Sequence, residues 1–368
     1  MKLLYIVSVN RKRDLGIWKK IETQLEAFGD YGIQAKCERI NVHEGQLLGS
    51  KLKTVKYEWD KIKIKDDVNV LYIRYPKASF ELIIFLKRVK KRNPNCKVLI
   101  EIPTYPYAGE RTTENSYIDI CDKLFRKMLK NYVDRIVTFS NDKVIFGIKT
   151  IRINNGINFS ENLLKENLND SSKDIHMIAV ATMKSWHGYE RLIIGISDYY
   201  KENGKRNVFL HMVGTGPELI KYQQLVSKNK LKDKIIFYGK KEGKELDSIF
   251  NTCDIGVLSL GNHRKNLFLT SELKSREYAA KGLLMIGSCK CDVFSSRKYP
   301  YFYLFPSSEC HIDVQKIIDF YDKIFKIGTQ REKTKKEIAM KIREYAEKKC
   351  DIHITMQPVI KYLKNNVK

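Results

Sequence analysis

Short, almost wholly apolar runs alternate along this chain with longer stretches in which apolar residues recur at helical spacing. The apolar runs lie at residues 2–9, 68–75, 96–103, 135–140, 176–182, 207–214, 234–239, 254–260 and 283–288. A strand that is apolar on both faces must be covered on both faces, which is typical of parallel sheets packed between helices. The pattern therefore predicts an α/β fold with doubly wound parallel sheets.

The helical stretches and one polar stretch predict the domain organisation. We expect helices at residues 16–31, 78–92, 115–131, 189–202, 217–229, 243–253 and from Lys274 onward. Residues 159–174 lack apolar periodicity and are rich in Asn, Ser and charge, as linkers are. We therefore expect an N-terminal domain at 1–158, a linker at 159–174, a second domain at 175–332, and C-terminal helices at 333–368 that pack back on the N-terminal domain.

Composition narrows the setting in which the protein works. The 368 residues contain no apolar run long enough to cross a membrane, and the apolar start of the chain is too short for a signal peptide. We therefore expect a cytoplasmic protein. The eight cysteines are scattered, and the C-x-C at Cys289 and Cys291 lacks a second pair at zinc spacing. Reduced thiols and no metal site are the expectation.

The net charge of +25 is shared by both halves of the chain. Such a field attracts phosphate groups, whether of a nucleotide, a nucleic acid or an anionic lipid. A solvated basic surface without a specific partner is the alternative, and charge alone does not decide between them.

Loops that follow the apolar runs of the second half carry glycines and cations. Ligands of parallel α/β sheets bind at the carboxyl ends of the strands. Glycines let backbone N–H groups approach a phosphate, and a helix N-terminus attracts its charge. The candidate binding residues in these loops are Lys184, His187, Gly188, Gly214, Gly216, Gly239, Lys240, Ser271, Leu273 and Lys274.

Several segments, in this order and spacing, resemble a known family. VGTGPEL, IIFYGKK, CDIGVLSL and SELKSREYAAKG are similar to the donor-binding domain of GT-B glycosyltransferases of family 4. NNGIN resembles the element that ends the N-terminal domain in that family. WHGYERL, EIPTYPYAGE and GIWKKIETQLEAF resemble a bacterial subgroup linked to capsule, exopolysaccharide or O-antigen synthesis, some members of which transfer galactofuranose. The resemblance implies a GT-B fold, in which two Rossmann-like domains face a cleft.

The resemblance also implies roles in nucleotide binding. Glu277 precedes a run of small residues as in the family, where this carboxylate accepts hydrogen bonds from the two ribose hydroxyls. A carboxylate suits a vicinal diol because it offers two acceptor oxygens. A Glu that only complements its own helix dipole is the alternative. The backbone N–H groups from Ser271 to Lys274 would face the distal phosphate.

The chain departs from the family at three positions. Leu269 stands where the family has a sugar-binding Glu, so the transferred sugar is open. Thr182 and His187 stand where the family has the Arg and Lys that hold the diphosphate. His187 either replaces the Lys as a donor to phosphate or packs beside Trp186 for structural reasons.

The N-terminal domain is expected to bind the acceptor. Gly16 would let the backbone of the first helix approach a substrate, with Lys19 and Lys20 one turn on. Many family members have a catalytic His in the region of EIPTYPYAGE, which has none. Among Glu101, Tyr105 and Glu110, we take Glu101 and Tyr105 as the catalytic candidates, Glu101 as general base. Glu101 as a structural partner of an arginine is the alternative.

The resulting hypothesis is a hexosyltransferase that moves a sugar from a UDP-linked donor to a glycan, lipid-linked at the inner membrane face. No Asp-x-Asp element follows a strand, so lysines, His187 and helix ends would stabilise the leaving diphosphate without metal. A nucleotide-sugar epimerase of the same fold is one alternative. A basic nucleic-acid-binding protein is another, although strands covered on both faces leave no exposed stacking platform. We expect no nucleic acid partner.

A membrane surface is a further expected partner. Residues 121–135 place Leu124, Phe125, Met128 and Leu129 in one stripe beside lysines, and 87–97 add a basic cluster. A basic amphipathic surface binds anionic lipid. The alternative is that the stripe packs on the sheet and the lysines are solvated.

Overall fold

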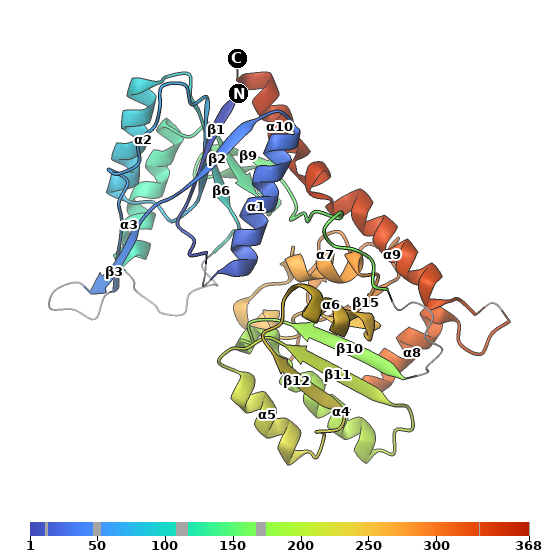
Figure 1. The fold of residues 1–368 in the computed structure, drawn as a ribbon. Coiled ribbons are helices and arrows are strands. Elements are labelled where there is room, and N and C mark those ends of the chain that lie inside the picture. Colours follow the sequence, from blue (N-terminus) through green and yellow to red (C-terminus); the bar gives the residue numbers. More distant parts are fainter. Residues whose placement is uncertain (12–13, 47–52, 108–116, 167–173, 331, 368) are drawn as a thin grey trace. The chain divides into compact units, whose positions relative to one another are not determined.

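The computed structural model describes residues 1–11, 14–46, 53–107, 117–166, 174–330 and 332–367. The chain divides into two compact units, which we call unit 1 and unit 2. Unit 1 comprises Met1–Gly156 and Ile352–Lys368, and unit 2 comprises Ile157–Asp351. Each unit is a parallel sheet covered by helices on both faces (Figure 1).

Unit 1 is built on a sheet in which only the last pairing is antiparallel. Its strands, in spatial order, are β2 (Gln34–Arg39), β1 (Lys2–Val7), β5 (Val70–Arg74), β6 (Lys97–Ile102), β7 (Arg135–Thr138), β9 (Ile148–Arg152) and β8 (Val144–Ile145). The antiparallel strands β3 (Val42–Gln46) and β4 (Lys53–Tyr57) form a separate ladder. The order of the main sheet reverses between β1 and β5, because β1 pairs with both β2 and β5.

Helices cover the two faces of this sheet. Leu3, Tyr5 and Val7 of β1 pack with α1 (Leu15–Asp30) and α10 (Ile352–Asn366). Leu4 and Ile6 face the other way, toward α2 (Phe80–Arg92), α3 (Tyr117–Phe125) and the 3-10 helix η2 (Arg126–Asn131). This alternation is why the strand is apolar at every position, as the sequence predicts.

Unit 2 has a wholly parallel main sheet. Its strands, in spatial order, are β12 (Ile235–Gly239), β11 (Val208–Val213), β10 (Ile175–Val180), β13 (Ile255–Val257), β15 (Leu284–Gly287) and β17 (Phe302–Leu304). Its helices are α4 (Glu190–Lys201), α5 (Leu219–Lys228), α6 (Gly243–Asn251), α7 (Leu273–Ala280), α8 (Val314–Phe325) and α9 (Lys335–Cys350). The strand order reverses between β10 and β13, and ligands of such sheets bind at this switch point.

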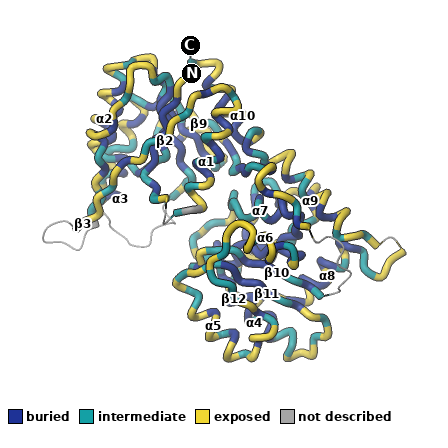
Figure 2. Tube along the Cα trace, in the orientation of Figure 1, coloured by how far each residue is buried: buried dark blue, intermediate teal, exposed yellow. Residues whose placement is uncertain are grey.

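The central strands of both sheets are among the most deeply buried parts of the chain (Figure 2). All eight cysteines are free, and most are buried. None of the helices in the described parts of the chain combines the length and apolar character needed to span a lipid bilayer.

The boundaries of the units differ from the expected ones. Of the C-terminal helices, α10 packs in unit 1 against α1, but α9 packs in unit 2 against α7. The guanidinium of Arg343 on α9 donates to the carbonyl oxygens of Ala280 and Phe159, both at 2.8 Å. Lys165, from the segment expected as a linker, is buried and pairs with Asp254 at 3.4 Å. The described start of that segment is therefore a packed part of unit 2.

Glu101 lies inside unit 1, with 0% of its surface exposed. Its Oε1 atom is 3.1 Å from Lys20 Nζ and 2.8 Å from an Arg74 guanidinium nitrogen. Its Oε2 atom accepts hydrogen bonds from Gln24 and Tyr72, both at 2.8 Å. Burial alone would raise the pKa of Glu101, but the two cations and these donors outweigh it, so the pKa falls to about 2.

This environment contradicts the expected general-base role of Glu101. Both of its oxygens are occupied by donors, and a carboxyl with so low a pKa is a poor proton acceptor. The geometry matches the alternative, a structural partner of an arginine, here Arg74. Lys20 is engaged in the same cluster and so is not available to an acceptor.

We predict that Glu101→Gln lowers the free energy of unfolding at pH 7 by about 3–5 kcal/mol, because two buried cations lose their anion. The folded pKa lies below the ordinary value of about 4.3, so the contribution is complete above that pH and is lost as the pH falls toward 2. Urea unfolding of both proteins should therefore converge at acid pH.

The matched control for this substitution is Asp67→Asn, which removes the exposed ion pair with Lys2. Exposed pairs contribute little to stability because water and salt screen them, so this variant should unfold almost as the wild type does. Equal effects of the two substitutions would contradict the structural role assigned to Glu101.

Candidate functional site

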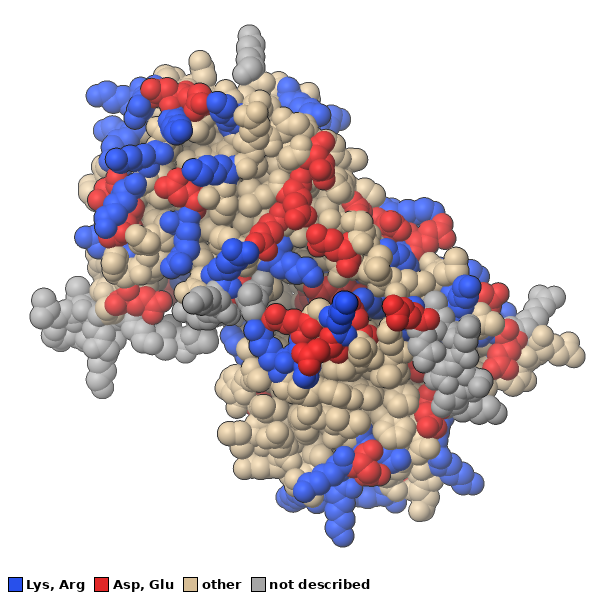
Figure 3. Space-filling model, in the orientation of Figure 1, with Lys and Arg blue, Asp and Glu red and all other residues tan. Residues whose placement is uncertain are grey.

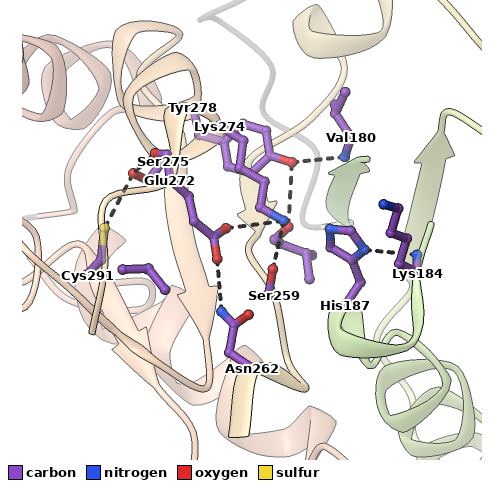
Figure 4. A network of polar contacts seen from close by, with 12 residues as sticks. Val180, Lys184, His187, Ser259, Asn262, Glu272, Lys274, Ser275, Tyr278 and Cys291 are labelled. Carbon is purple, nitrogen blue, oxygen red and sulfur yellow. Dashed lines mark hydrogen bonds and ion pairs between the residues drawn. The ribbon is translucent and has the colours of Figure 1, made fainter. Parts of the chain in front are cut away.

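Polar side chains gather at the switch point of unit 2, where the loops after β10 and β13 meet the start of α7 (Figure 4). The first loop contains the 3-10 helix η3 (Ser185–His187), and the second contains η4 (Asn262–Lys265). The Leu260 N–H donates to the His187 carbonyl oxygen at 2.7 Å. Gly188 has a positive φ of 61°, and a Cβ there would lie 2.7 Å from the Gly261 nitrogen. The two loops therefore hold each other in place.

Helix α7 is fixed by two buried side chains. Arg276 is wholly buried, and its guanidinium lies 2.5 Å from Asp292 and 2.9 Å from the Ser271 hydroxyl. Two residues on, the Tyr278 hydroxyl accepts the Val180 N–H at the end of β10, at 2.9 Å. These contacts position the N-terminus of α7 at the carboxyl end of the sheet, where its dipole favours an anion.

Lys274, in the first turn of α7, is the cation at the centre of this site. Its Nζ atom lies 3.1 Å from the Ser259 hydroxyl, 3.4 Å from the Tyr189 hydroxyl and 3.2 Å from a Glu272 oxygen. The other Glu272 oxygen accepts the Asn262 amide at 2.9 Å. Burial would raise the pKa of Glu272, but Lys274 and these donors lower it overall, so the carboxylate is ionised and orients Lys274.

His187 presents a neutral imidazole beside Lys274. Its Nδ1 atom accepts the Lys184 backbone N–H at 3.0 Å, which leaves the ring proton on Nε2. The ring stacks on Tyr189 with centroids 5.4 Å apart. Burial first, and then the charges of Lys274 and neighbouring lysines, lower the pKa of His187 to about 2. The ring therefore packs on an aromatic residue and also carries a directed N–H donor.

Lysines also surround Trp186. The Nζ atoms of Lys184 and Lys265 lie 4.8 and 4.5 Å from its ring centroid, at cation–π distance. Lys184 therefore lies beside the candidate site in contact with the indole ring, and its expected role in binding stays a prediction. Lys265 comes from the loop after β13 and brings a further cation to the same place.

Glycines of the loop after β11 serve packing. Gly214 and Gly216 have positive φ values of 121° and 150°. A Cβ at Gly214 would lie 2.0 Å from the Ala181 oxygen, and one at Gly216 would lie 2.3 Å from the Met183 oxygen. Close contact with the neighbouring loop therefore requires glycine at these two positions, and their expected role in phosphate binding stays a prediction.

Gly239 and Lys240 lie at the end of the edge strand β12, two strands from the switch point. Gly239 has a positive φ of 65°, and the Gly214 N–H donates to its carbonyl oxygen at 2.7 Å. Lys240 is exposed and pairs with Glu242 at 3.0 Å. Their expected role in phosphate binding stays a prediction.

The remaining candidates of unit 2 lie on or before α7. Glu277 is half-buried in the second turn of this helix. Leu273 packs against the core, and its backbone N–H, like that of Lys274, belongs to the first turn, whose N–H groups lack partners within the helix. The Ser271 hydroxyl donates to Asp292 at 2.8 Å. Leu269 is exposed in the short strand β14 (Leu269–Thr270).

The candidates of unit 1 have different surroundings. Gly16 lies exposed in the first turn of α1, and a Cβ there would meet no atom within 4 Å. Tyr105 follows β6 and packs with Tyr107 and Phe146 at centroid distances of 6.2 and 6.0 Å. Its catalytic role stays a prediction. Glu110 lies outside the described residues.

Sequence reasoning missed the parts played by Ser259, Tyr189 and Glu272. Ser259 and Tyr189 contact Lys274 from other segments of the chain. Glu272, at the start of α7, directs its carboxylate toward Lys274. A hydroxyl near the end of the apolar run 254–260 was the available signal for Ser259. Within the ranges that the structure describes, no group of three His, Cys, Asp or Glu residues is arranged to hold a metal ion.

Sequence comparison identifies one matching segment. The family model for glycosyl transferases group 1 matches residues 160–262, which contain β10 to β13 and the loops that follow them. None of the curated protein sequences matches the chain.

Solved structures of similar fold cover nearly the whole chain. A glycosyltransferase from Rickettsia africae is 15% identical, with a TM-score of 0.65 over 99% of this chain and 98% of that one. Sucrose-phosphate synthase from Thermosynechococcus elongatus is 13% identical, with a TM-score of 0.65 over 99% of both chains. HepE of Anabaena, solved with UDP and glucose, is 11% identical, with a TM-score of 0.61 over 99% of both. These likenesses confirm the predicted GT-B fold.

We predict that the free energy of unfolding falls less steeply with decreasing pH in His187→Asn than in the wild type. In the unfolded chain the imidazole binds a proton below its ordinary pKa of about 6.5, but the folded protein does not bind it until about pH 2. This difference costs stability as the pH falls, by at most about 1.4 kcal/mol per pH unit. Urea unfolding between about pH 6 and pH 4.5 should show a smaller loss for the variant than for the wild type.

The substitution of the exposed His311 by Asn is the control for the general loss of an imidazole. Long-range proton–nitrogen NMR provides a second measurement and should place the proton of His187 on Nε2. A His187 ring that becomes charged near pH 6 would contradict the assignment.

Proposed function

We propose that the protein is a glycosyltransferase that uses a nucleotide-diphosphate sugar as donor, bound at the switch point of unit 2. The observation that carries the proposal is the convergence of the Lys274 ammonium, the His187 Nε2–H and the α7 N-terminus at the carboxyl end of the sheet. The match of residues 160–262 to glycosyl transferases group 1 supports it independently.

The chemistry of glycosyl transfer suits these groups. The bond between the sugar and the diphosphate breaks, and negative charge grows on the leaving phosphate oxygen. Donors that are already fixed in place stabilise such charge without reorganisation. Lys274 is held by Ser259 and Glu272, and His187 is held by the Lys184 N–H. Both therefore fit the task of receiving the leaving diphosphate.

Uridine is the base that we propose for the donor, and Glu277 is the residue that we propose for the ribose. HepE, one of the similar structures, was solved with UDP. Glu277 follows Lys274 by almost one helical turn, and its carboxylate offers two acceptors to a vicinal diol. The resemblance of SELKSREYAAKG to the family's donor-binding helix supports the same role.

The acceptor and the sugar are proposed on the resemblance of shorter segments. We take the transferred group to be a hexosyl group and the acceptor to be a lipid-linked glycan of a bacterial surface polysaccharide. Galactofuranose is one candidate sugar, because some members of the resembling subgroup transfer it. Leu269 in place of the family's sugar-binding Glu leaves the hexose to be determined by experiment.

We predict that UDP stabilises the protein and that EDTA does not abolish the effect, since lysines and N–H groups can hold the diphosphate. A ligand at 100 times its dissociation constant adds about 2.7 kcal/mol to the free energy of unfolding. Thermal unfolding with UDP, UMP and other nucleoside diphosphates measures it. No shift with any nucleoside diphosphate would refute the donor site.

We predict that Glu277→Gln weakens UDP binding about 10- to 100-fold, because a hydrogen bond to a charged group is worth about 1.5–3 kcal/mol. Calorimetric titration gives the affinity, and circular dichroism checks the fold. Glu347→Gln, on the exposed face of α9, is the matched control and should bind UDP as the wild type does. Unchanged affinity of the Glu277 variant would leave Glu277 as a residue that only complements its helix.

A further inference from the structure

Helix α3 places both of its acidic residues inside unit 1, beside the buried Ile118, and exposes Tyr117, Ile120 and Leu124. Asp122 is buried and accepts hydrogen bonds from the hydroxyls of Tyr75 and Tyr107 and from the Ala78 N–H at 2.8 Å. Asp119 is buried and pairs with Lys77 at 2.5 Å. This orientation is the reverse of that of an ordinary surface helix.

An apolar surface results on the outside. We call it the α3 face and define it by the exposed fractions of its side chains: Phe80 58%, Ile84 38%, Tyr117 43%, Ile120 45%, Leu124 66% and Met128 40%. Phe80 and Ile84 belong to α2, which adjoins α3, and the Phe80 ring lies 6.0 Å from that of Phe125. Single exposed apolar residues are ordinary, but a group on two adjacent helices marks an interaction site.

Basic residues adjoin the α3 face. Lys123, Lys127 and Lys130 are exposed, and among the described residues no acid lies at ion-pair distance from any of them. Lys87 and Lys91 continue the exposed side of α2, at helical spacing from Phe80 and Ile84. Figure 3 shows Lys and Arg side chains along the side of unit 1 that α2 forms. Glu81 is the single exposed acid within the described α2, α3 and η2.

The structure changes the sequence-based picture of this surface. Leu129 is buried and Phe125 is half-buried, so only Leu124 and Met128 of the expected stripe face outward. Lys90 and Arg92 of the expected basic cluster are engaged, with Asp134 at 2.8 Å and with Asp66 at 2.5 Å. The basic residues that remain for a partner are therefore the lysines of α3, η2 and α2.

We infer that the α3 face docks the protein on an anionic lipid surface. Apolar side chains would enter the boundary of headgroups and acyl chains, and the flanking lysines would bind the lipid phosphates. A second copy of the chain is a poor occupant, because each copy carries +25 and would oppose lysines to lysines. Docking itself does not depend on the proposed function. Only its purpose, which is to bring the enzyme to a lipid-linked acceptor, rests on that function.

The test uses the full chain and sedimentation with vesicles of phosphatidylcholine alone or mixed with phosphatidylglycerol. Binding is expected to the anionic vesicles only and to be lost at high salt. Lys123→Glu, Lys127→Glu and Lys130→Glu together should weaken it at least about 100-fold, since each lysine near anionic lipid contributes close to a factor of five. Ile120→Ser with Leu124→Ser should weaken it about tenfold.

Matched controls come from exposed residues of unit 2. Lys228→Glu, Lys232→Glu and Lys244→Glu change the net charge equally, and Ile220→Ser with Met340→Ser removes equally exposed apolar side chains. Both control variants should bind anionic vesicles nearly as the wild type does. Equal weakening by test and control variants would overturn the α3 face as the docking site, and so would binding to neutral vesicles or to none.

UDP binding, measured by thermal shift on every variant, separates this inference from the proposed function. Retained UDP binding together with lost vesicle binding shows that the test variants are folded and that the α3 face acts in docking. Vesicle binding without UDP binding would refute the donor site and leave the lipid-docking surface standing.

Discussion

The buried pair of Arg276 and Asp292 is the contact on which the arrangement of the candidate site depends. A guanidinium with no exposed surface is tolerated only when its charge and its N–H groups are matched, and Asp292, Ser271 and Ser275 match them here. Because Arg276 lies in the middle of α7, the pair fixes the helix along its axis. The hydrogen bond from the Val180 N–H to the Tyr278 hydroxyl then attaches the helix to the end of β10. These two attachments of α7 place Lys274 at the switch point.

Glu101, which is buried, and Glu272, which is half-buried, show how similar residues acquire different uses. Glu101 has donors on both oxygens and two cations on one of them, so neither oxygen is available to accept a proton during a reaction. Glu272 has an amide on one oxygen and a lysine on the other, and that lysine also contacts two hydroxyls. Glu101 therefore stabilises a sheet, whereas Glu272 orients a cation that can turn to a ligand.

The sequence predicted what local pattern determines and missed what distant partners determine. The parallel strands were predictable because strands buried on both faces are apolar at nearly every position. Strand β2, with the sequence QAKCER, was missed because an edge strand half-exposed to water carries polar residues. The inward turn of α3 was missed because Asp119 and Asp122 find their partners in the loops after β5 and β6. The close contact that Gly214 and Gly216 make with the loop after β10 was also missed, because that loop is distant in sequence.

The electrostatics of the site explain why a neutral histidine fits beside Lys274. Lys274, Lys265 and Lys184 already surround His187, so a charged imidazole would repel all three. A neutral ring avoids this repulsion and still offers a directed N–H, which can donate a hydrogen bond to a phosphate oxygen. Burial is the larger cause of the lowered pKa of His187, and the charges of the three lysines add to it, so the ring is neutral. The arrangement therefore presents an uncharged N–H donor among cations, a property that a lysine at this position would lack.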